Sequence, residues 1–313
     1  MSQKQSVAKV KQICLGLISL ARLRIVGMEL VACAIGYILA YHGDFLLLRF
    51  FWTLLGTALL SSGACALNCF LEREQDALMA RTCNRPIPAG IISPSVGLGY
   101  GMALILSGCL ALFVNVNALS GILGLSAAFI YLAVYTPAKR LTWLNTSIGA
   151  IPGAIPPLIG WAAARGQLDA GGWILFAMLF IWQHTHFFPI AWLYREDYKK
   201  GGFKMLPVLE LDGEKTFQLT VATAIALLPA SLMLCSAVAT GGAYWLGSIL
   251  FCLVLIAASL RLLQKPSRTA ARMVLLLSLV YLPVILGAVV VDRYGVQLGS
   301  RVHAWLETTW RWT

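Results

Sequence analysis

Nine long apolar stretches run through this sequence, and each has the roughly 20 residues that a helix needs to cross a lipid bilayer. Backbone polar groups inside a bilayer must be hydrogen-bonded within the protein, so repeated stretches of this length fold as a bundle of transmembrane helices. We therefore expect an all-α membrane protein with nine transmembrane helices. The expected spans are residues 25–41, 50–71, 94–114, 118–136, 144–164, 172–192, 217–239, 243–263 and 272–291.

The low content of charged residues excludes an ordinary soluble enzyme. Charged residues make up 12% of the chain, about half the share of a typical soluble domain, and the mean hydropathy is +0.79. We expect one transmembrane domain over residues 25–291, preceded by a segment over residues 1–24 and followed by an amphipathic tail over residues 292–313. The tail's tryptophans, which are typical of a membrane interface, are Trp305, Trp310 and Trp312.

The placement of basic residues predicts the orientation of the bundle. If the N-terminus is cytoplasmic, all but five of the 24 lysines and arginines lie on the cytoplasmic side, as positively charged loops do in membrane proteins. The exceptions are Arg49, Arg165, Arg293, Arg301 and Arg311. The C-terminus is then outside. No transit peptide is recognisable in residues 1–24, which favours a bacterial inner membrane.

The net charge of +11 follows mainly from this topology. The basic residues lie in short loops between spans, so nucleic acid is not an expected partner. We expect some of them to contact anionic membrane lipid and others to contact an anionic substrate.

Three oxygen-bearing side chains end the second span. Asn68, Glu72 and Asp76 are spaced four residues apart, which puts them on one face of a helix. Carboxylates at the edge of a membrane are costly without a partner, and Mg²⁺ is the hard cation that such oxygen ligands favour. The alternative is an ordinary solvated helix end. The spacing predicts a magnesium site shared with a phosphate group.

Cations follow the carboxylates and recur in two further loops. Arg81 and Arg85 come directly after Asp76, and a guanidinium binds phosphate oxygens bidentately. Taken alone, they would be ordinary cytoplasmic charges, but beside the carboxylates they favour a diphosphate site. The loops after the fourth and sixth spans share this side of the membrane, so one site can draw on all three loops.

These motifs together resemble the UbiA-type intramembrane prenyltransferases over roughly residues 20–290. The family's first signature corresponds to Asn68-x3-Glu72-x3-Asp76, with a glutamate in place of its first aspartate. A second signature corresponds to Tyr135-x3-Lys139. The chain is most similar to the branch that farnesylates heme. The matching residues of that branch are Met79, Arg81-Thr82, Arg85-Pro86, residues 153–161, His186-Phe187, Asp197-Tyr198 and Met205-Leu206-Pro207.

The resemblance implies a nine-helix prenyltransferase that transfers a farnesyl group from farnesyl diphosphate to a vinyl group of heme B, giving heme O. It implies Mg²⁺ held by Asn68, Glu72 and Asp76, with Asp197 as a further catalytic residue and His186 at the heme. It also suggests association with a downstream heme A synthase or with a second copy of the chain. The residues implied for diphosphate binding are Arg81, Arg85, Tyr135, Lys139, Arg140 and Lys199.

Two other functions remain open on the sequence. One is prenyl transfer to a different aromatic or tetrapyrrole acceptor, against which His186 and the sparse second acidic motif, Glu196-Asp197, both argue. The other is a transporter, which would carry helix breaks near the middle of its spans. Its best support is the break at Pro156-Pro157, whereas the charges gather at one face. Binding of heme or of farnesyl diphosphate discriminates among the three.

Three polar residues within the spans have weaker predictions. His184 and His186 are two residues apart and point to different faces of a helix, so they do not readily ligate one iron together. A lone histidine near the end of a span is often a hydrogen-bonded core residue. Glu29, inside the first span, is expected to face the bundle, with no specific function assigned.

Overall fold

The computed structural model describes residues 3–41, 45–210, 212–238 and 241–310, with the backbone alone for residues 3–9, 290, 293–294 and 296–310. Within these residues nine helices are long and apolar enough to cross a membrane, which confirms the predicted number. The nine spans are Leu23–Ala40, Leu47–Leu71, Pro94–Asn115, Ala118–Leu141, Asn145–Arg165, Ala170–Leu193, Glu214–Ala237, Gly242–Gln264 and Arg268–Val289.

Seven of the nine spans lie in single helices. They are α2 (Leu23–Ala40), α3 (Leu47–Leu71), α5 (Pro94–Asn115), α10 (Ala170–Leu193), α13 (Glu214–Ala237), α14 (Gly242–Gln264) and α15 (Arg268–Trp310). The fourth span is built from α6 (Ala118–Phe129), the π-helix η1 (Ile130–Tyr135) and α7 (Thr136–Leu141), and the fifth from α8 (Asn145–Ala154) and α9 (Pro156–Arg165). The remaining helices are α1 (Gln3–Leu20), α4 (Arg73–Leu78), α11 (Arg195–Lys200) and α12 (Leu206–Leu209).

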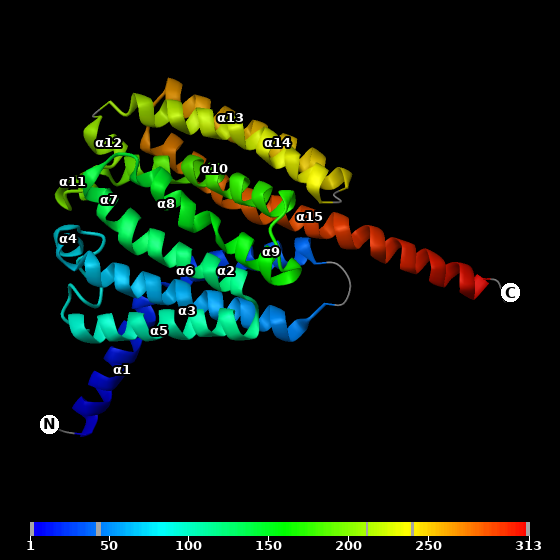
Figure 1. Cartoon of the computed structure of the whole chain (residues 1–313). Coiled ribbons are helices and arrows are strands. Elements are labelled where there is room, and N and C mark those ends of the chain that lie inside the picture. Colours follow the sequence, from blue (N-terminus) through cyan, green and yellow to red (C-terminus); the bar gives the residue numbers. More distant parts are fainter. Residues whose placement is uncertain (1–2, 42–44, 211, 239–240, 311–313) are drawn as a thin grey trace.

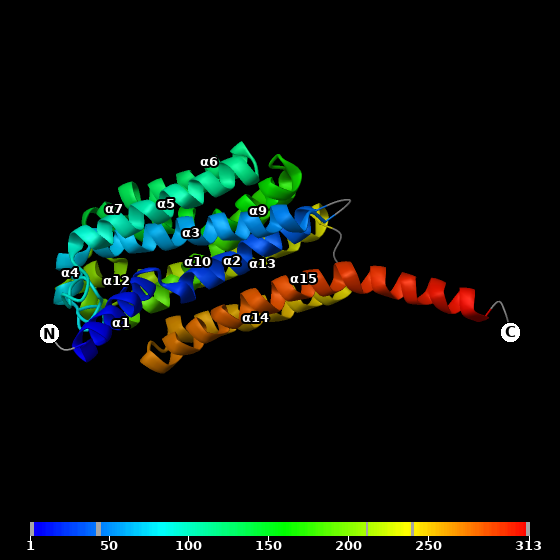
Figure 2. The ribbon, with the colours of Figure 1, turned by 90° about the horizontal axis from the view of Figure 1, so that it is seen from below.

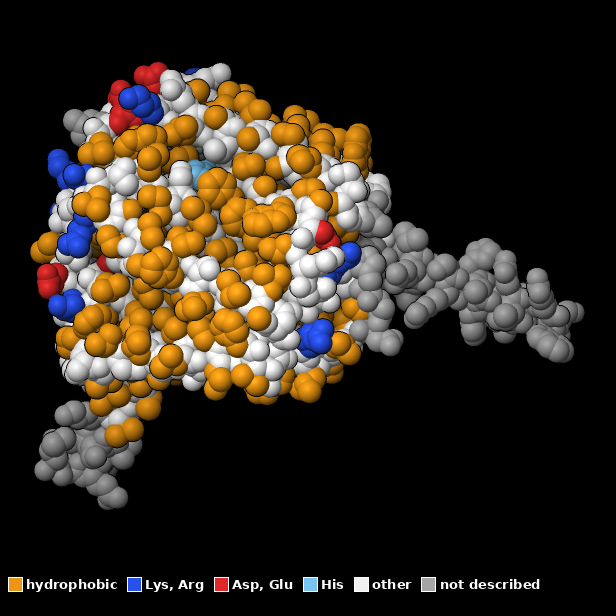
Figure 3. All heavy atoms as spheres, in the orientation of Figure 1, with side chains coloured by type: hydrophobic (Ala, Val, Ile, Leu, Met, Phe, Trp, Pro, Cys, Tyr) orange, Lys and Arg blue, Asp and Glu red, His pale blue; other side chains and the backbone are white. Residues whose placement is uncertain are grey.

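The short helices gather at one end of the bundle. In Figure 1, α4, α7, α11 and α12 all lie at the left end, where the chain leaves the second, fourth and sixth spans. Figure 3 shows blue and red charged side chains at the same end and hydrophobic side chains along the middle of the molecule. The prediction that these three loops share one face is confirmed.

Proline explains the irregularity of the fourth and fifth spans. Pro137 has no N–H, so the regular hydrogen bond to the carbonyl four residues earlier is missing. The N–H of Thr136 instead donates to the carbonyl of Tyr131, which is the wider π turn of η1. Pro156 and Pro157 likewise start α9 after a break at Ile155.

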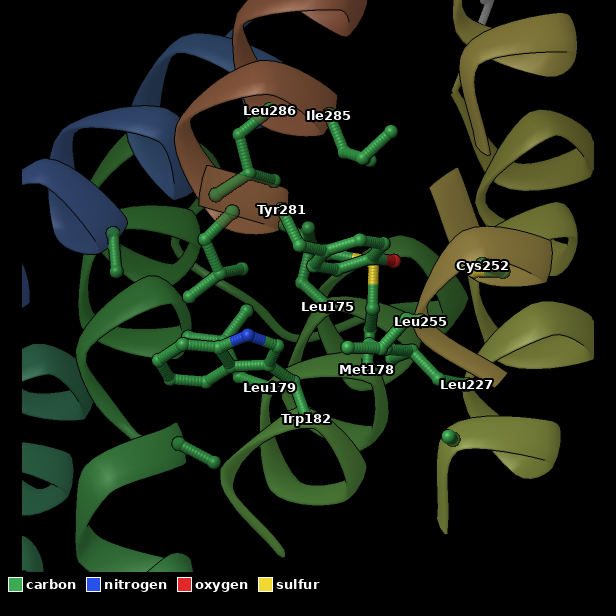
Figure 4. Packing of buried hydrophobic residues seen from close by; sticks show 14 of the residues in the cluster. Leu175, Met178, Leu179, Trp182, Leu227, Cys252, Leu255, Tyr281, Ile285 and Leu286 are labelled. Atoms are coloured by element: carbon green, nitrogen blue, oxygen red, sulfur yellow. The ribbon is translucent and has the colours of Figure 1, made fainter. Parts of the chain in front are cut away.

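The largest apolar core joins α10 to the last three helices (Figure 4). Trp182 lies at its centre, and its indole N–H donates to the carbonyl of Ser278 on α15 at 2.8 Å. Met178, also on α10, and Tyr281, on α15, are completely buried beside it. This core fixes the face of α10 that carries Trp182 and His186.

Glycines let α3, which carries the site residues, lie directly against α5. A Cβ atom on Gly108 would lie 2.7 Å from the carbonyl oxygen of Gly56, and one on Gly63 would lie 2.7 Å from that of Gly101. Small residues at matching heights allow backbones to approach closely, which is how helices associate in membranes. The two pairs hold α3 in place at two heights.

Both ends of the chain contain more helix than the sequence indicated. Residues 1–24 include α1, whose Leu20 is buried against the bundle. At the other end α15 is a single helix of 43 residues, about 64 Å long at 1.5 Å per residue. Figure 2 shows it extending beyond the other helices. The side chains of Trp305 and Trp310, and the whole of Trp312, lie outside the described residues.

The glycine contacts predict the effect of one added methyl group. Gly108→Ala should destabilise the protein by about 1–3 kcal/mol, because the new Cβ would overlap the backbone of α3. Gly99→Ala is the matched control on the same helix, since a Cβ there meets no atom within 4 Å. Thermal unfolding of both variants in one detergent measures the difference. Equal unfolding temperatures would contradict this packing.

Candidate active site

The three predicted metal ligands lie together at the end of α3, and all are buried. Exposed fractions are 0% for Asn68, 5% for Glu72 and 0% for Asp76. The helix is interrupted at Glu72, between α3 and α4, but the hydrogen-bond ladder continues across it. The N–H of Glu72 donates to Asn68 at 2.9 Å, and that of Asp76 donates to Glu72 at 2.8 Å. The spacing that places the three on one face is thereby kept.

Glu72 is paired with a lysine from the fourth span. Lys139 Nζ donates to Glu72 Oε1 at 2.7 Å, and the two side chains are only 11% and 7% exposed. The same ammonium lies 4.6 Å from the centre of the Tyr135 ring, a cation–π distance. The π turn ends at Tyr135 and leads directly into α7, so it sets where both residues of the second signature stand.

Asp76 is paired with an arginine from its own loop. Arg85 Nη1 donates to Asp76 Oδ1 at 2.7 Å and to Oδ2 at 2.5 Å. The side chain of Asp76 is 1% exposed, and that of Arg85 is 26% exposed. Thr82 donates its hydroxyl to the backbone carbonyl of Asp76, which turns the loop back toward the helix. The side chain of Arg85 thereby contacts Asp76, which lies nine positions earlier in the chain.

Asn68 retains an oxygen that is available to a ligand. Its Nδ2 donates to Thr136 Oγ1 at 3.1 Å, and Thr136 in turn donates to the carbonyl of Tyr131. Its Oδ1 is buried and has no hydrogen-bond partner among the described residues. A buried amide oxygen without a partner is costly, so this atom suits a cation. With the two carboxylates it forms a set of hard oxygen donors that fits Mg²⁺.

The protein offers few further ligands to such a cation. Across the described part of the chain, no three His, Cys, Asp or Glu side chains are grouped closely enough to hold a metal ion. Mg²⁺ commonly takes one or two carboxylates and completes its coordination with phosphate oxygens and water. The donor set therefore suits a metal bound together with a phosphate-bearing substrate.

Arg81 connects the loop after α3 to the loop after α10. Its Nη2 donates to the hydroxyl of Tyr198 at 3.3 Å, and its guanidinium lies 4.9 Å from the centre of the Tyr194 ring. Arg81 is exposed at the end of the bundle. Arg81 and Arg85 therefore come from the loop after α3 and Lys139 comes from α7, and Arg81 also contacts the loop after α10.

Among the described residues, three predicted site residues do not take part in the ion pairs of the two buried carboxylates. Arg140 and Lys199 are exposed and Asp197 is half-buried at the same end of the bundle. In the described ranges none of them forms an ion pair with Glu72 or Asp76. Their assignment to catalysis or diphosphate binding stays a prediction.

The two histidines of α10 point to different neighbours, as their spacing predicted. His184 has both ring nitrogens hydrogen-bonded, one to the carbonyl of Phe180 and one to the hydroxyl of Ser147. His186 is 9% exposed, bonds through Nδ1 to Ser278 and stacks on Trp182 with ring centres 5.0 Å apart. Only His186 has a ring nitrogen, Nε2, without a hydrogen-bond partner among the described residues.

Two residues near the site were not given a function by the sequence. Arg22, counted there only as a loop charge, donates to Cys69 Sγ at 3.4 Å, next to Asn68. Its backbone is left-handed, with φ of 48° at the junction of α1 and α2. Glu29 is half-buried and lies close to Ser61 on α3, as expected for a side chain that faces the bundle. The sequence feature that could have indicated a role for Arg22 is its position directly before the first span.

Sequence comparisons extend these observations. A profile described as the UbiA prenyltransferase family matches residues 30–281. The protoheme IX farnesyltransferase of Solibacter usitatus is 41% identical over 89% of this chain and 99% of its own length. That of Anaeromyxobacter dehalogenans is 40% identical over 88% of this chain and 93% of its own length.

Solved structures share the fold at low sequence identity. Digeranylgeranylglyceryl phosphate synthase superposes with a TM-score of 0.76 at 18% identity, over 91% of this chain and 98% of that chain. A UbiA homolog from Archaeoglobus fulgidus bound to GPP and Mg²⁺ superposes with a TM-score of 0.62 at 15% identity, over 88% of this chain and 99% of that chain.

The pairing of Glu72 with Lys139 predicts a non-additive effect on stability. Lys139→Met should destabilise the protein by about 3–5 kcal/mol, because it leaves a buried carboxylate without a partner. The double variant Glu72→Gln/Lys139→Met should recover much of that loss, since no charge remains to be buried. Unfolding of the single and double variants gives the coupling free energy. Additive effects would contradict a direct pair.

Proposed function

The chain belongs to the UbiA prenyltransferase family, and we propose that it transfers the farnesyl group of farnesyl diphosphate to heme B, releasing diphosphate and forming heme O. It is an integral, multi-pass membrane protein. The observation that carries the proposal is the cluster of Asn68, Glu72 and Asp76 with its paired cations at one end of an apolar bundle. Relatives named protoheme IX farnesyltransferase support the acceptor.

Ionisation of the diphosphate is the step that the site residues favour. The bond between the allylic carbon and the diphosphate oxygen breaks, and its electron pair leaves with the diphosphate. Arg81, Arg85 and Lys139 stabilise the negative charge that develops there, because fixed cations in a site sheltered from water act strongly on a transition state. Mg²⁺, held by Asn68, Glu72 and Asp76, would supply Lewis-acid stabilisation of the same leaving group.

Bond formation then joins the two substrates. The vinyl group of heme attacks the allylic carbon with its π electrons, which leaves a positive charge on the inner vinyl carbon. Water adds to that carbon and loses a proton, so the product carries a hydroxyethylfarnesyl group. The apolar bundle around the site limits premature loss of the allylic cation to water.

The remaining site residues take supporting roles in this proposal. Arg140 and Lys199, exposed beside the site, attract the anionic substrate before it binds. Tyr135 positions Lys139 through its ring. Asp197, at the start of α11, is the further catalytic residue that we propose at the diphosphate-binding end of the site. Mg²⁺ as the metal is supported by the family's fold, since the Archaeoglobus fulgidus homolog was solved with Mg²⁺ and GPP.

His186 is proposed to contact heme. Its Nδ1 is occupied by Ser278 and its ring is fixed against Trp182, so Nε2 keeps a defined direction. A hydrogen bond on one ring nitrogen sets the tautomer and orientation of the other, as in metal-bound histidines. His184 lacks this freedom because both of its nitrogens are bonded.

We propose the bacterial inner membrane as the location, with the N-terminus and the active end cytoplasmic and the C-terminus outside. The distribution of basic residues supports this orientation. Residues 1–24 then form a cytoplasmic segment, residues 25–291 the catalytic domain and residues 292–313 an outer tail. Association with a downstream heme A synthase, or with a second copy, would pass on a product too apolar to diffuse freely in water.

Purified protein should convert heme B to heme O when it is given farnesyl diphosphate and Mg²⁺, as measured by mass analysis of the extracted heme. Asp76→Ala should lower the rate by about 10²-fold or more, because a ligand for the charge-stabilising metal is lost. Glu74→Gln is the matched control, since Glu74 lies on the same helix and is exposed. Near-normal turnover by Asp76→Ala, or in excess chelator, would contradict the metal's role.

Replacing His186 tests whether this residue acts on heme or on farnesyl diphosphate. His186→Ala should impair the response to heme more than the affinity for farnesyl diphosphate, because the residue lies on α10, away from the carboxylates. Titrating heme at saturating farnesyl diphosphate, and measuring diphosphate affinity separately, checks this. His184→Ala serves as control for a histidine on the same helix. An unaltered heme response with lost diphosphate binding would place His186 in the donor site instead.

A further inference from the structure

Each buried carboxylate of the site is held by a cation that has a second task. Lys139 occupies Glu72 Oε1, and Arg85 spans both oxygens of Asp76. Lys139 and Arg85 are also the cations proposed to bind the diphosphate. By contrast, Arg73 and Glu74 form an exposed pair on the same segment, away from this role.

The two tasks compete for the same atoms. A metal ion on Glu72 and Asp76 uses the carboxylate lone pairs that now accept hydrogen bonds from Lys139 and Arg85, and its positive charge repels both side chains. A metal arriving alone therefore has to displace two cations that have no other side-chain acceptor among the described residues. A diphosphate arriving alone has to draw the same cations away from carboxylates that then remain buried without partners.

We propose that Lys139 and Arg85 exchange partners on binding, moving from the carboxylates to the diphosphate as the metal takes the carboxylates. The inference rests on the proposed function and adds a coupling within that site. Each ligand supplies the partner that the other removes, so metal and diphosphate bind as a linked pair. By thermodynamic reciprocity each raises the affinity for the other by the same factor.

The local structure allows the exchange without a change of fold. Lys139 has a flexible four-carbon stem that allows its ammonium to move, and the ammonium already lies 4.6 Å from the centre of the Tyr135 ring. Arg85 lies on the loop after α4, with its side chain partly exposed. Asn68, in contrast, is fixed by Thr136 while its Oδ1 stays available. The oxygen donors stay in place and the cations move.

Measuring metal binding in the absence of diphosphate tests the proposal, because the exchange predicts that removing either cation increases the affinity for metal. Lys139→Met and Arg85→Met keep an unbranched, apolar stem at each position and remove its charge. Each should bind Mn²⁺ alone about tenfold more tightly than the wild type, because the competing cation is gone. Mn²⁺ serves as a paramagnetic probe that prefers the same oxygen ligands as Mg²⁺. Equilibrium dialysis of the full chain in detergent measures the affinity.

A matched variant and the alternative roles sharpen this test. Arg73→Met removes an equivalent charge from the exposed pair with Glu74 and should leave Mn²⁺ affinity unchanged. If Lys139 and Arg85 only bind phosphate, their removal also leaves Mn²⁺ affinity unchanged. If they only hold the carboxylates in position, their removal weakens Mn²⁺ binding. Either of these results overturns the exchange.

A second measurement uses the wild type and so does not depend on the folding of a variant. Lys139 is buried against Glu72, and a metal that displaces it should increase its reaction with an amine-specific reagent severalfold. Mass analysis of peptides with and without Mn²⁺ quantifies the labelling, and the exposed Lys199 serves as internal control. Unchanged labelling of Lys139 at saturating Mn²⁺ overturns the proposal.

The outcomes separate this inference from the function on which it rests. Farnesyl transfer to heme, with Mn²⁺ affinity unaffected by Lys139→Met and Arg85→Met, removes the exchange and keeps the function. Absence of Mn²⁺ binding in the wild type and in both variants removes the metal site and the exchange together. Tighter Mn²⁺ binding in both variants, with normal affinity in Arg73→Met, supports the exchange.

Discussion

Two carboxylates buried at the end of an apolar bundle are the constraint on which the rest of the site depends. A charge in such a place is tolerated only with a partner, and two irregular features nearby supply one each. The turn after α4 brings Arg85 back to Asp76, and the π turn of η1 leads into the helix that carries Lys139. Thr136, at the end of that turn, fixes Asn68.

Local patterns in the sequence were sufficient to predict the spans and the clustering of the three loops at one end of the bundle. Hydrophobic length and the spacing of Asn68, Glu72 and Asp76 depend only on neighbouring residues. The partners of the carboxylates were not predictable in this way. Glu72 and Lys139 are 67 residues apart, and their contact exists because two spans pack side by side. The break at Glu72 and the half-buried position of Arg22 are tertiary effects of the same kind.

The bundle uses two kinds of packing for two purposes. Glycines bring α3 and α5 into backbone contact, which keeps the helix that bears the carboxylates from shifting along its neighbour. Large side chains around Trp182 hold α10 against α15 and direct His186. The proposed donor end is therefore positioned by close backbone contact, whereas the proposed acceptor side is positioned by aromatic packing and side-chain hydrogen bonds.

The length of α15 has a consequence for studying the protein in cells. The helix continues beyond Asp292, whose carboxylate accepts two hydrogen bonds from the start of α14, and reaches Trp310 without a break. The roughly 20 residues from there to Trp310 place the end of the helix about 30 Å beyond that contact. A fluorescent reporter fused to the C-terminus would stand clear of the bundle, at the end opposite the carboxylates (Figure 1). It would record sidedness and abundance without obstructing substrate entry.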